Sequence, residues 1–340
     1  MDRYDEFQRK KEEHQRYIAR KRKKRGILAG MMIITVIAMT GFFLKDRFLS
    51  GAKHPDGEEL ELMDSGGVGT SEKDQIVSGF QRGSLRESLD SQKTLPGRVD
   101  LHQLSPGRNH SMKASRYAYS TEKVRGWIWG GVPYDGEKVA FLTFDDGPVE
   151  MSYEVLDLLK RRNVPATFFI PGYVLDEHAD KEVLHRYIEE GHAIGIHSYS
   201  HVYEKLYPGR TADKDVILEE FIATRNLMRE TLGDAFDSKV FRFPGGSMSW
   251  NGIKEAQAKL NASGIYDMDW NALSGDGEPA SRRPDGAEAM AEHVIYTLEE
   301  HWIQDIAVVL MHDTKAITVE YLDQVIDQFI EAGYTFGILE

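Results

Sequence analysis

The sequence VAFLTFDDGP at residues 139–148 contains an uninterrupted apolar run that ends in two acidic residues and a Gly-Pro turn. The run 139–144 predicts a strand, because short β-rich segments bounded by turn residues are typical of strands. An amphipathic segment follows at 153–162 and predicts a helix, and a second β-rich segment comes next at 166–170. This alternation continues to residue 340 and predicts a parallel α/β sheet, either open or closed into a barrel.

The same reading extends along the rest of the body. Further strands are expected at 193–196, 240–243, 264–268, 306–311 and 334–338, and further helices at 181–190, 213–232, 251–262, 287–302 and 318–332. In folds of this class the chemistry lies at the carboxyl ends of the strands. The polar motifs described next mostly follow expected strands directly, so we expect them to meet at one edge of the sheet.

Asp145 and Asp146 stand directly after the strand expected at 139–144, and Gly147-Pro148 forces a turn behind them. Two adjacent acids at a strand end suit a pair in which one carboxylate binds a cation while the other takes up a proton. Taken alone, the motif also fits a turn in which an aspartate caps the following helix.

His197 and His201 lie four residues apart in the segment HSYSH, after the strand expected at 193–196. Side chains at this spacing share one face of a helical turn, so we expect such a turn here, with both imidazoles able to reach one ion. An aspartate from another strand end would complete a two-histidine, one-aspartate site with positions left open for water, as in a catalytic divalent-metal site. Two solvent-exposed or core histidines are the alternative.

Arg242 begins the segment RFPGG at the end of the strand expected at 240–243. An arginine in this place can clamp a carboxylate with two hydrogen bonds. The Pro244-Gly245-Gly246 turn leaves backbone N–H groups open to a developing oxyanion. An ordinary turn with an exposed arginine is the alternative.

His312 follows the strand expected at 306–311, and its reference pKa of about 6.5 makes it a candidate general acid. The segment 267–277 (DMDWNALSGDG) precedes it, is rich in acids and contains Trp270. This segment can orient His312 and offer a stacking face to a sugar. An exposed histidine, or one satisfied in the core, is the alternative.

The N-terminal part has a different organisation. Residues 26–44 are 19 residues without a charge, and a helix of that length rises ~28 Å, close to the thickness of the bilayer hydrocarbon. The basic run KRKKR at 21–25 precedes them, so the positive-inside rule predicts an uncleaved transmembrane anchor with a cytoplasmic tail, 1–25. A cleaved signal peptide and a buried core helix are the alternatives. Residues 45–115 show no lasting periodicity and predict an extended extracytoplasmic spacer, and 116–340 form the folded body.

Composition narrows the function classes. The net charge is −13 although residues 1–25 carry 11 Lys or Arg against 5 Asp or Glu, which leaves an acidic body. An acidic body is a poor partner for nucleic acid, because phosphate contacts need clustered Lys and Arg. The chain has no cysteine, which excludes disulfides, thiolate metal ligands and cysteine nucleophiles. The oligomeric state cannot be read from the sequence.

These motifs together resemble the polysaccharide deacetylases with a NodB-homology domain, the carbohydrate esterases of family four. The family's motifs occur in order: TFDDGP at 143–148, H-[ST]-x-x-H at 197–201, Arg-x-Pro at 242–244, a variant acidic-Trp motif, and Leu-x-His at 310–312. The resemblance covers roughly residues 118–340. It implies a distorted, incomplete (β/α) barrel as the fold of the catalytic domain.

The resemblance also implies roles. Asp145 would be the general base, and Asp146, His197 and His201 would hold the metal. Two imidazoles and a carboxylate accept several divalent ions, so we expect zinc, while cobalt, nickel and manganese stay open.

The other implied roles concern the surroundings of the metal. Arg242 would hold the general base, and His312 would be the general acid that protonates the departing amine. The Gly245 N–H would meet the tetrahedral oxyanion, and Pro244 and Trp270 would line the substrate groove.

The third motif departs from the family pattern. Many members have tyrosine after the motif's proline, whereas this chain has Gly245. The backbone donor is kept, but a side-chain wall of the groove is lost.

The fourth motif, usually Asp-x-x-Asp-Trp, departs more strongly. Aligning Trp270 with the family's upstream tryptophan places Leu273 at the first aspartate, Asp276 at the second and Gly277 at the motif's tryptophan. Asp276 would then tune the general acid. In an alternative register, Asp269 and Trp270 form the Asp-Trp pair.

From the resemblance and the anchor we expect a deacetylase in the cell membrane, with its catalytic domain outside, acting on acetylated glycan. N-acetylglucosamine of peptidoglycan is the expected substrate, while chitin-like oligomers, O-acetyl xylan and exopolysaccharides stay open. A glycan-binding or scaffold protein that keeps the metal but turns over little is the alternative from another class. A cytosolic hydrolase of small amides would conflict with the anchor.

Overall fold

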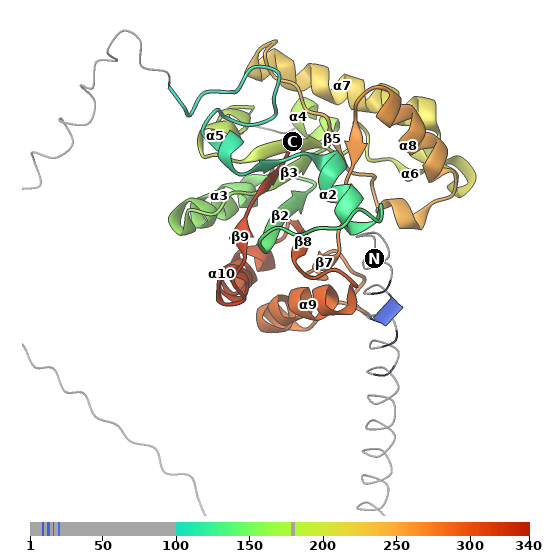
Figure 1. The fold of residues 1–340 in the computed structure, drawn as a ribbon. Helices are drawn as coiled ribbons and strands as arrows, with labels where there is room; N and C mark the ends of the chain where they lie inside the picture. Colours follow the sequence, from blue (N-terminus) through green and yellow to red (C-terminus); the bar gives the residue numbers. More distant parts are fainter. Residues whose placement is uncertain (1–8, 10–11, 14–15, 17–19, 21–99, 178–180) are drawn as a thin grey trace, which may run out of the picture. The chain divides into compact units, whose positions relative to one another are not determined.

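The computed structural model describes residues 9, 12–13, 16, 20, 100–177 and 181–340 (Figure 1). The anchor predicted at 26–44 lies outside the described residues, as do nearly all of the tail and most of the spacer. Among the residues that are described, no helix is both long enough and apolar enough to cross a bilayer.

A curved parallel sheet forms the centre of the body. Its strands run in the order β6 (Tyr266–Asp267), β5 (Val240–Phe241), β4 (Ala193–Ile196), β3 (Thr167–Ile170), β2 (Val139–Asp145), β8 (Ile306–His312) and β7 (Ala272–Leu273), and β9 (Thr335–Phe336) pairs with β2. The edge strands β6 and β7 are neighbours in sequence but are each paired on one side only within this sheet. The sheet is therefore a barrel left open between β6 and β7, which confirms the distorted barrel.

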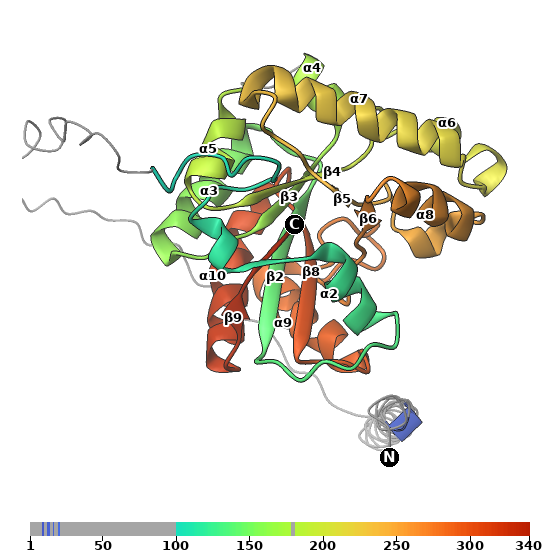
Figure 2. The ribbon, with the colours of Figure 1, turned by 45° about the horizontal axis from the view of Figure 1, so that its top comes forward.

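Helices surround this sheet (Figures 1 and 2). The long ones are α3 (Glu150–Arg162), α7 (Lys214–Leu232), α8 (Ile253–Ala262), α9 (Gly286–Glu300) and α10 (Ala316–Glu331), and α5 (Val183–Glu189) is shorter. Shorter elements are α2 (Thr121–Ile128), α4 (Gly172–Glu177), α6 (Tyr203–Leu206), and the pair β1 (Ala118–Tyr119) with β10 (Ile338–Leu339). Asp213 begins α7 as its N-cap, where its carboxylate accepts hydrogen bonds from two backbone N–H groups.

Two apolar layers explain why the strands are so uniformly apolar. One layer packs the sheet against the outer helices. The second fills the barrel interior, where Val124 and Ile128 of α2 pack with Phe141, Phe169 and Val308. All seven residues of β2 are buried, as expected for a parallel strand that is covered on both faces.

Most predicted elements are confirmed within a few residues of their observed bounds, but the strand expected at 334–338 is two short strands, β9 and β10, which pair with β2 and β1. The expected start of the folded body is too late. The body includes residues 100–115, where the sequence predicts the end of the spacer. Asn109 donates hydrogen bonds from Nδ2 to the carbonyls of Ile194 and Leu339, both at 3.0 Å, and His110 forms a bridge with Ala193. Side-chain and backbone hydrogen bonds, rather than a periodic apolar face, attach this segment to the body. The hydrophobic pattern of the sequence therefore did not reveal it.

Candidate metal and catalytic site

The predicted site residues gather at the carboxyl ends of four strands of the same parallel sheet, β5, β4, β2 and β8. Asp145 is the last residue of β2 and stands in register with His312, the last residue of β8. His197 follows β4 directly, and Arg242 follows β5. The parallel sheet thus brings together residues that lie up to 167 positions apart in the chain.

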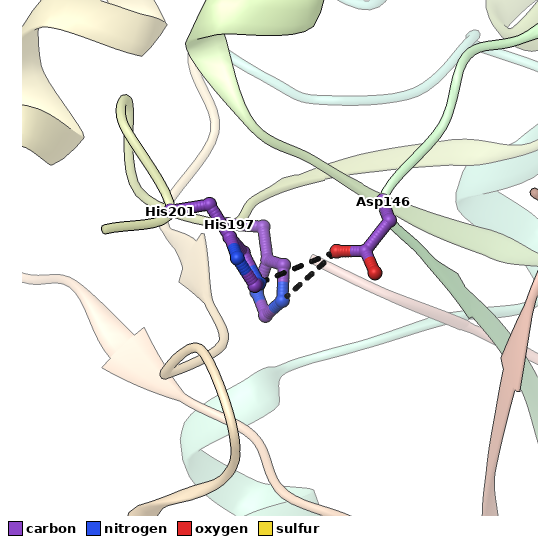
Figure 3. A group of neighbouring side chains, drawn as sticks. All are labelled: Asp146, His197 and His201. Atoms are coloured by element: carbon purple, nitrogen blue, oxygen red, sulfur yellow. Dashed lines mark ion pairs between the residues drawn. The ribbon is translucent and has the colours of Figure 1, made fainter. Parts of the chain in front are cut away.

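Asp146, His197 and His201 form a compact group (Figure 3). The Oδ1 atom of Asp146 lies 3.6 Å from Nε2 of His197 and 3.4 Å from Nε2 of His201. Ligands bound at about 2.1 Å and roughly 110° apart around one ion would have separations of about this size. The three side chains therefore fit a divalent cation, with further positions open to water or substrate.

His197 is held in the form that binds a metal. Its Nδ1 lies 2.9 Å from the carbonyl oxygen of Arg242. A carbonyl can only accept, so Nδ1 carries the proton and Nε2 presents its lone pair to Asp146. Burial lowers the pKa of His197 to about 3, which keeps the ring neutral.

The histidine segment is not the helical turn that we expected from the i, i+4 spacing. Residues 197–201 form a loop in which Ser198 and His201 have φ values of 65° and 53°. Asp146 also has a positive φ, 77°. These left-handed conformations, rather than one helical face, bring the ligands together.

Arg242 is fully buried and holds Asp145. Its Nη1 donates to Oδ1 of Asp145 at 2.7 Å and to Oγ1 of Thr143 at 2.8 Å, and its Nε donates to the carbonyl of Met268 at 2.8 Å. The guanidinium carbon lies 3.9 Å from the ring centre of Phe169. One oxygen of Asp145 is thereby fixed, while Oδ2 lies 3.7 Å from Nε2 of His197, beside the metal ligands.

His312 lies on another side of the same group. Its Nε2 is 3.9 Å from Oδ2 of Asp146, and its Nδ1 is 2.8 Å from Oδ1 of Asp276. Burial disfavours the charged ring, but the hydrogen bond and charge of Asp276, together with Asp145 and Asp146, raise the pKa of His312 to about 9. The ring is therefore an imidazolium at neutral pH and can donate a proton.

Asp276 is itself well supported. Tyr321 donates from its hydroxyl to Oδ2 at 2.8 Å, and Thr318 donates at 3.3 Å. Burial opposes ionisation, but the bonds from His312 and Tyr321 outweigh it and lower the pKa of Asp276. Asp269, the alternative partner of His312, instead accepts hydrogen bonds from the backbone N–H and hydroxyl of Ser247, so the alternative register is wrong.

The turn after Arg242 has little room for side chains. Gly245 and Gly246 have φ values of 75° and 78°. A Cβ on Gly245 would lie 3.2 Å from the hydroxyl of Tyr203, and a Cβ on Gly246 would lie 2.7 Å from the ring of Trp270. The carbonyl of Pro244 accepts from Nε1 of Trp250 at 2.9 Å. The contact of Pro244, Gly245 and Trp270 with a sugar stays a prediction.

Two polar residues of the site, Thr143 and Glu220, were not predicted from the sequence. Thr143 is a second acceptor for Arg242, and Glu220 of α7 binds the backbone of the histidine loop. One feature of the sequence could have indicated Glu220. It is an acidic residue on the buried face of the amphipathic helix α7, together with Ile217, Phe221 and Thr224.

Comparisons with known proteins agree with this geometry. The model of the polysaccharide deacetylase family matches residues 133–263. A peptidoglycan-N-acetylglucosamine deacetylase of Bacillus cereus is 32% identical over 200 residues, which cover 58% of this chain and 68% of that protein.

Solved structures give the same picture. The structure of a Streptococcus mutans CE4 esterase is 40% identical with a TM-score of 0.67, and the match covers 71% of this chain and all of that one. The catalytic domain of a peptidoglycan N-acetylglucosamine deacetylase from Eubacterium rectale is 30% identical with a TM-score of 0.52, covering 61% of this chain and 90% of that one.

Proposed function

The chain belongs to the polysaccharide deacetylases, the CE4 carbohydrate esterases, and from this premise we propose that it is a metal-dependent N-deacetylase of cell-wall glycan. One observation carries the proposal: a buried carboxylate and an imidazolium lie beside one two-histidine, one-aspartate group. Asp145 is 3.7 Å from His197, and His312 is 3.9 Å from Asp146. Such a pair of base and acid around a cation site is what amide hydrolysis requires.

Asp146, His197 and His201 would hold the cation. A bound divalent cation supplies a Lewis acid that polarises the acetyl carbonyl and lowers the pKa of water. We propose zinc, and the same donor set also accepts cobalt, nickel or manganese.

The protein's own groups move the protons. Asp145 accepts the proton of the attacking water on Oδ2, because Arg242 holds its other oxygen. The new bond joins the water oxygen to the acetyl carbon, and the Gly245 N–H donates to the oxygen that gains charge. His312 gives its Nε2 proton to the nitrogen as the carbon–nitrogen bond breaks, which releases acetate and a free amine. Asp276 then holds His312 in place to be protonated again.

We propose N-acetylglucosamine of peptidoglycan as the substrate. The name of the Bacillus cereus relative, which is 32% identical, supports this choice. The uncharged segment at 26–44 with its basic flank supports a membrane anchor, and the spacer behind it would let the catalytic domain reach the wall. Pro244, Gly245 and Trp270 would line the groove.

The substrate assignment is tested by the acetate that the full-length protein releases from three polymers in the presence of zinc. Peptidoglycan, N-acetylglucosamine oligomers and acetylated xylan are offered in parallel, with the Asp145→Asn variant as control. We expect release from peptidoglycan that the control lacks, and mass spectrometry should find the free amine on glucosamine. Release from xylan alone would contradict the N-deacetylase assignment. Binding of peptidoglycan without release would favour the glycan-binding alternative.

A further inference from the structure

The loop 197–201, which carries both histidine ligands, is stabilised mainly by hydrogen bonds to residues outside the loop. Ser198 and His201 adopt left-handed conformations, which cost roughly 1–2 kcal/mol for a residue with a side chain. Within the loop, the backbone N–H of His201 donates to Oγ of Ser198 at 3.0 Å. The rest of the support comes from residues outside the loop. Backbone bonds from neighbouring segments of the chain hold the first half of the loop: the N–H groups of Gly172 and Tyr173 donate to the carbonyls of Ser198 and Tyr199, and the N–H of His197 donates to the carbonyl of Ile170.

Glu220 of α7 holds the N–H groups of the second half of the loop. Its Oε2 accepts the backbone N–H groups of Tyr199 and Ser200, each at 3.0 Å, and its Oε1 accepts the hydroxyl of Ser200 at 2.7 Å. Lys205, just beyond the loop, lies 2.8 Å from the same Oε1. Glu220 is only 4% exposed, so these bonds form away from water, where they are stronger.

Thr224 lies one turn after Glu220 on the same face of α7 and also binds the loop. Its hydroxyl donates to the carbonyl of Ser198 at 2.9 Å. Glu220 therefore accepts from the middle of the loop while Thr224 donates to its beginning. Ser200, which Glu220 binds, is next to His201, and Ser198, which Thr224 binds, is next to His197. A shift of the loop would therefore move both imidazoles.

We propose that Glu220 is a positioning residue that fixes the histidine loop and thereby sets the affinity of the site for its divalent cation. The inference rests on the metal site of the proposed function. The bonds of Glu220 go to Tyr199, Ser200 and Lys205, so it acts through the loop backbone. Replacing it with glutamine would keep one acceptor oxygen but would turn an NH2 group toward the donors of Tyr199, Ser200 or Lys205.

The test uses the full-length metal-free protein and measures the Kd for Zn²⁺ by competition with a chromophoric chelator. The visible absorption spectrum of the Co²⁺-loaded protein reports the coordination geometry. Outer groups that orient metal ligands typically change affinity roughly 10–100-fold, so we expect Glu220→Gln to weaken Zn²⁺ binding by that factor and to change the Co²⁺ spectrum. The control is Glu219→Gln, which removes the same charge from the neighbouring, exposed position of α7 and should leave both readouts unchanged.

Thermal unfolding of the metal-free variants separates positioning from general stability, because a merely structural role would lower the Tm without changing the Kd of the folded protein. A folded Glu220→Gln variant with a Kd within twofold of the wild type overturns the inference. If that variant does not fold, Ser200→Ala decides, since it removes one donor to Glu220; we expect its Kd to rise several-fold, and an unchanged Kd overturns the inference.

The outcomes also separate this inference from the proposed function. Wild-type protein that binds Zn²⁺ but releases no acetate counts against the deacetylase and leaves the role of Glu220 standing. A wild type that binds no divalent metal overturns both.

Discussion

Asp276 holds His312 at two points with one carboxylate. Its Oδ1 lies 2.8 Å from Nδ1 of the ring, and its Oδ2 accepts the backbone N–H of the same histidine at 2.8 Å. The ring is thus fixed with Nε2 toward the metal ligands and is kept protonated. Asp276 and His312 lie 36 positions apart in sequence, and the turn after β7 brings them together.

The charge of His312 should depend on Asp276. In the metal-free protein we expect an imidazole pKa of about 9 for His312. In Asp276→Asn the hydrogen bond and charge of Asp276 are lost, while burial still lowers the pKa and Asp145 and Asp146 still raise it, so the pKa should fall from about 9 toward the ordinary value of about 6.5. Carbon-13 NMR titration of the histidine rings measures both values. An unchanged pKa in the variant would show that Asp276 does not tune His312.

The same pair should contribute a pH-dependent part of the stability. The folded pKa of His312 is raised from 6.5 to about 9, so its contribution is fully present below pH 6.5 and is lost as the pH rises through 9. The shift corresponds to ~3 kcal/mol. The difference in unfolding free energy between wild type and Asp276→Asn should therefore narrow by an amount of that order between pH 6.5 and 9.5, measured by urea denaturation. A difference that stays constant over this range would contradict the linkage.

The buried pair of Arg242 and Asp145 should be sensitive to the loss of one partner. Arg242→Met leaves Asp145 buried without its cation, which typically costs about 3–5 kcal/mol. We expect a loss of this size in urea denaturation, and partial recovery in the double variant Arg242→Met/Asp145→Asn, which removes the stranded charge. The control is Arg283→Met at an exposed position, where the change should be below about 0.5 kcal/mol. Equal effects at both positions would refute the pairing.

Gly245 should tolerate no side chain without cost. A Cβ there would have to adopt φ near 75° and would meet the hydroxyl of Tyr203 at 3.2 Å and the ring of Trp250 at 3.4 Å. We expect Gly245→Ala to lose ~1–2 kcal/mol of stability from the left-handed backbone alone. Combining it with Tyr203→Phe, which removes the crowding hydroxyl, should restore part of any further loss. Stability equal to the wild type would show that the turn has another conformation in solution.

The sequence predicted the elements that have a clear hydrophobic pattern of their own. The long apolar strands β2 and β8 and the amphipathic helices α7 and α10 were expected close to their observed bounds. The two-residue strand β7 was missed, because its place depends on Asn271, which bonds to the backbone of Ile306 and Val308 with both side-chain atoms. Helix α2 was also missed, although its buried face fills the barrel.

In the candidate site, too, some features were predicted from the sequence and others were not. The metal ligands were expected from motifs that follow strands, whereas the Arg242–Asp145 contact and the role of Asp276 were expected from the family resemblance. The shape of the histidine loop was predicted wrongly, since an i, i+4 spacing says nothing of a glutamate 19 positions beyond the second histidine that holds the backbone.

The central claim, that a cation held by three ligands works with a separate base, is tested most directly by measuring bound zinc and released acetate on the same preparations. The full-length wild type, His201→Ala and Asp145→Asn are incubated with intact peptidoglycan. The account predicts about one zinc per chain and acetate release in the wild type. It predicts loss of both zinc and release in His201→Ala. In Asp145→Asn it predicts retained zinc with release reduced by roughly 10²–10⁴-fold. Release by His201→Ala without zinc, or undiminished release by Asp145→Asn, would contradict the account.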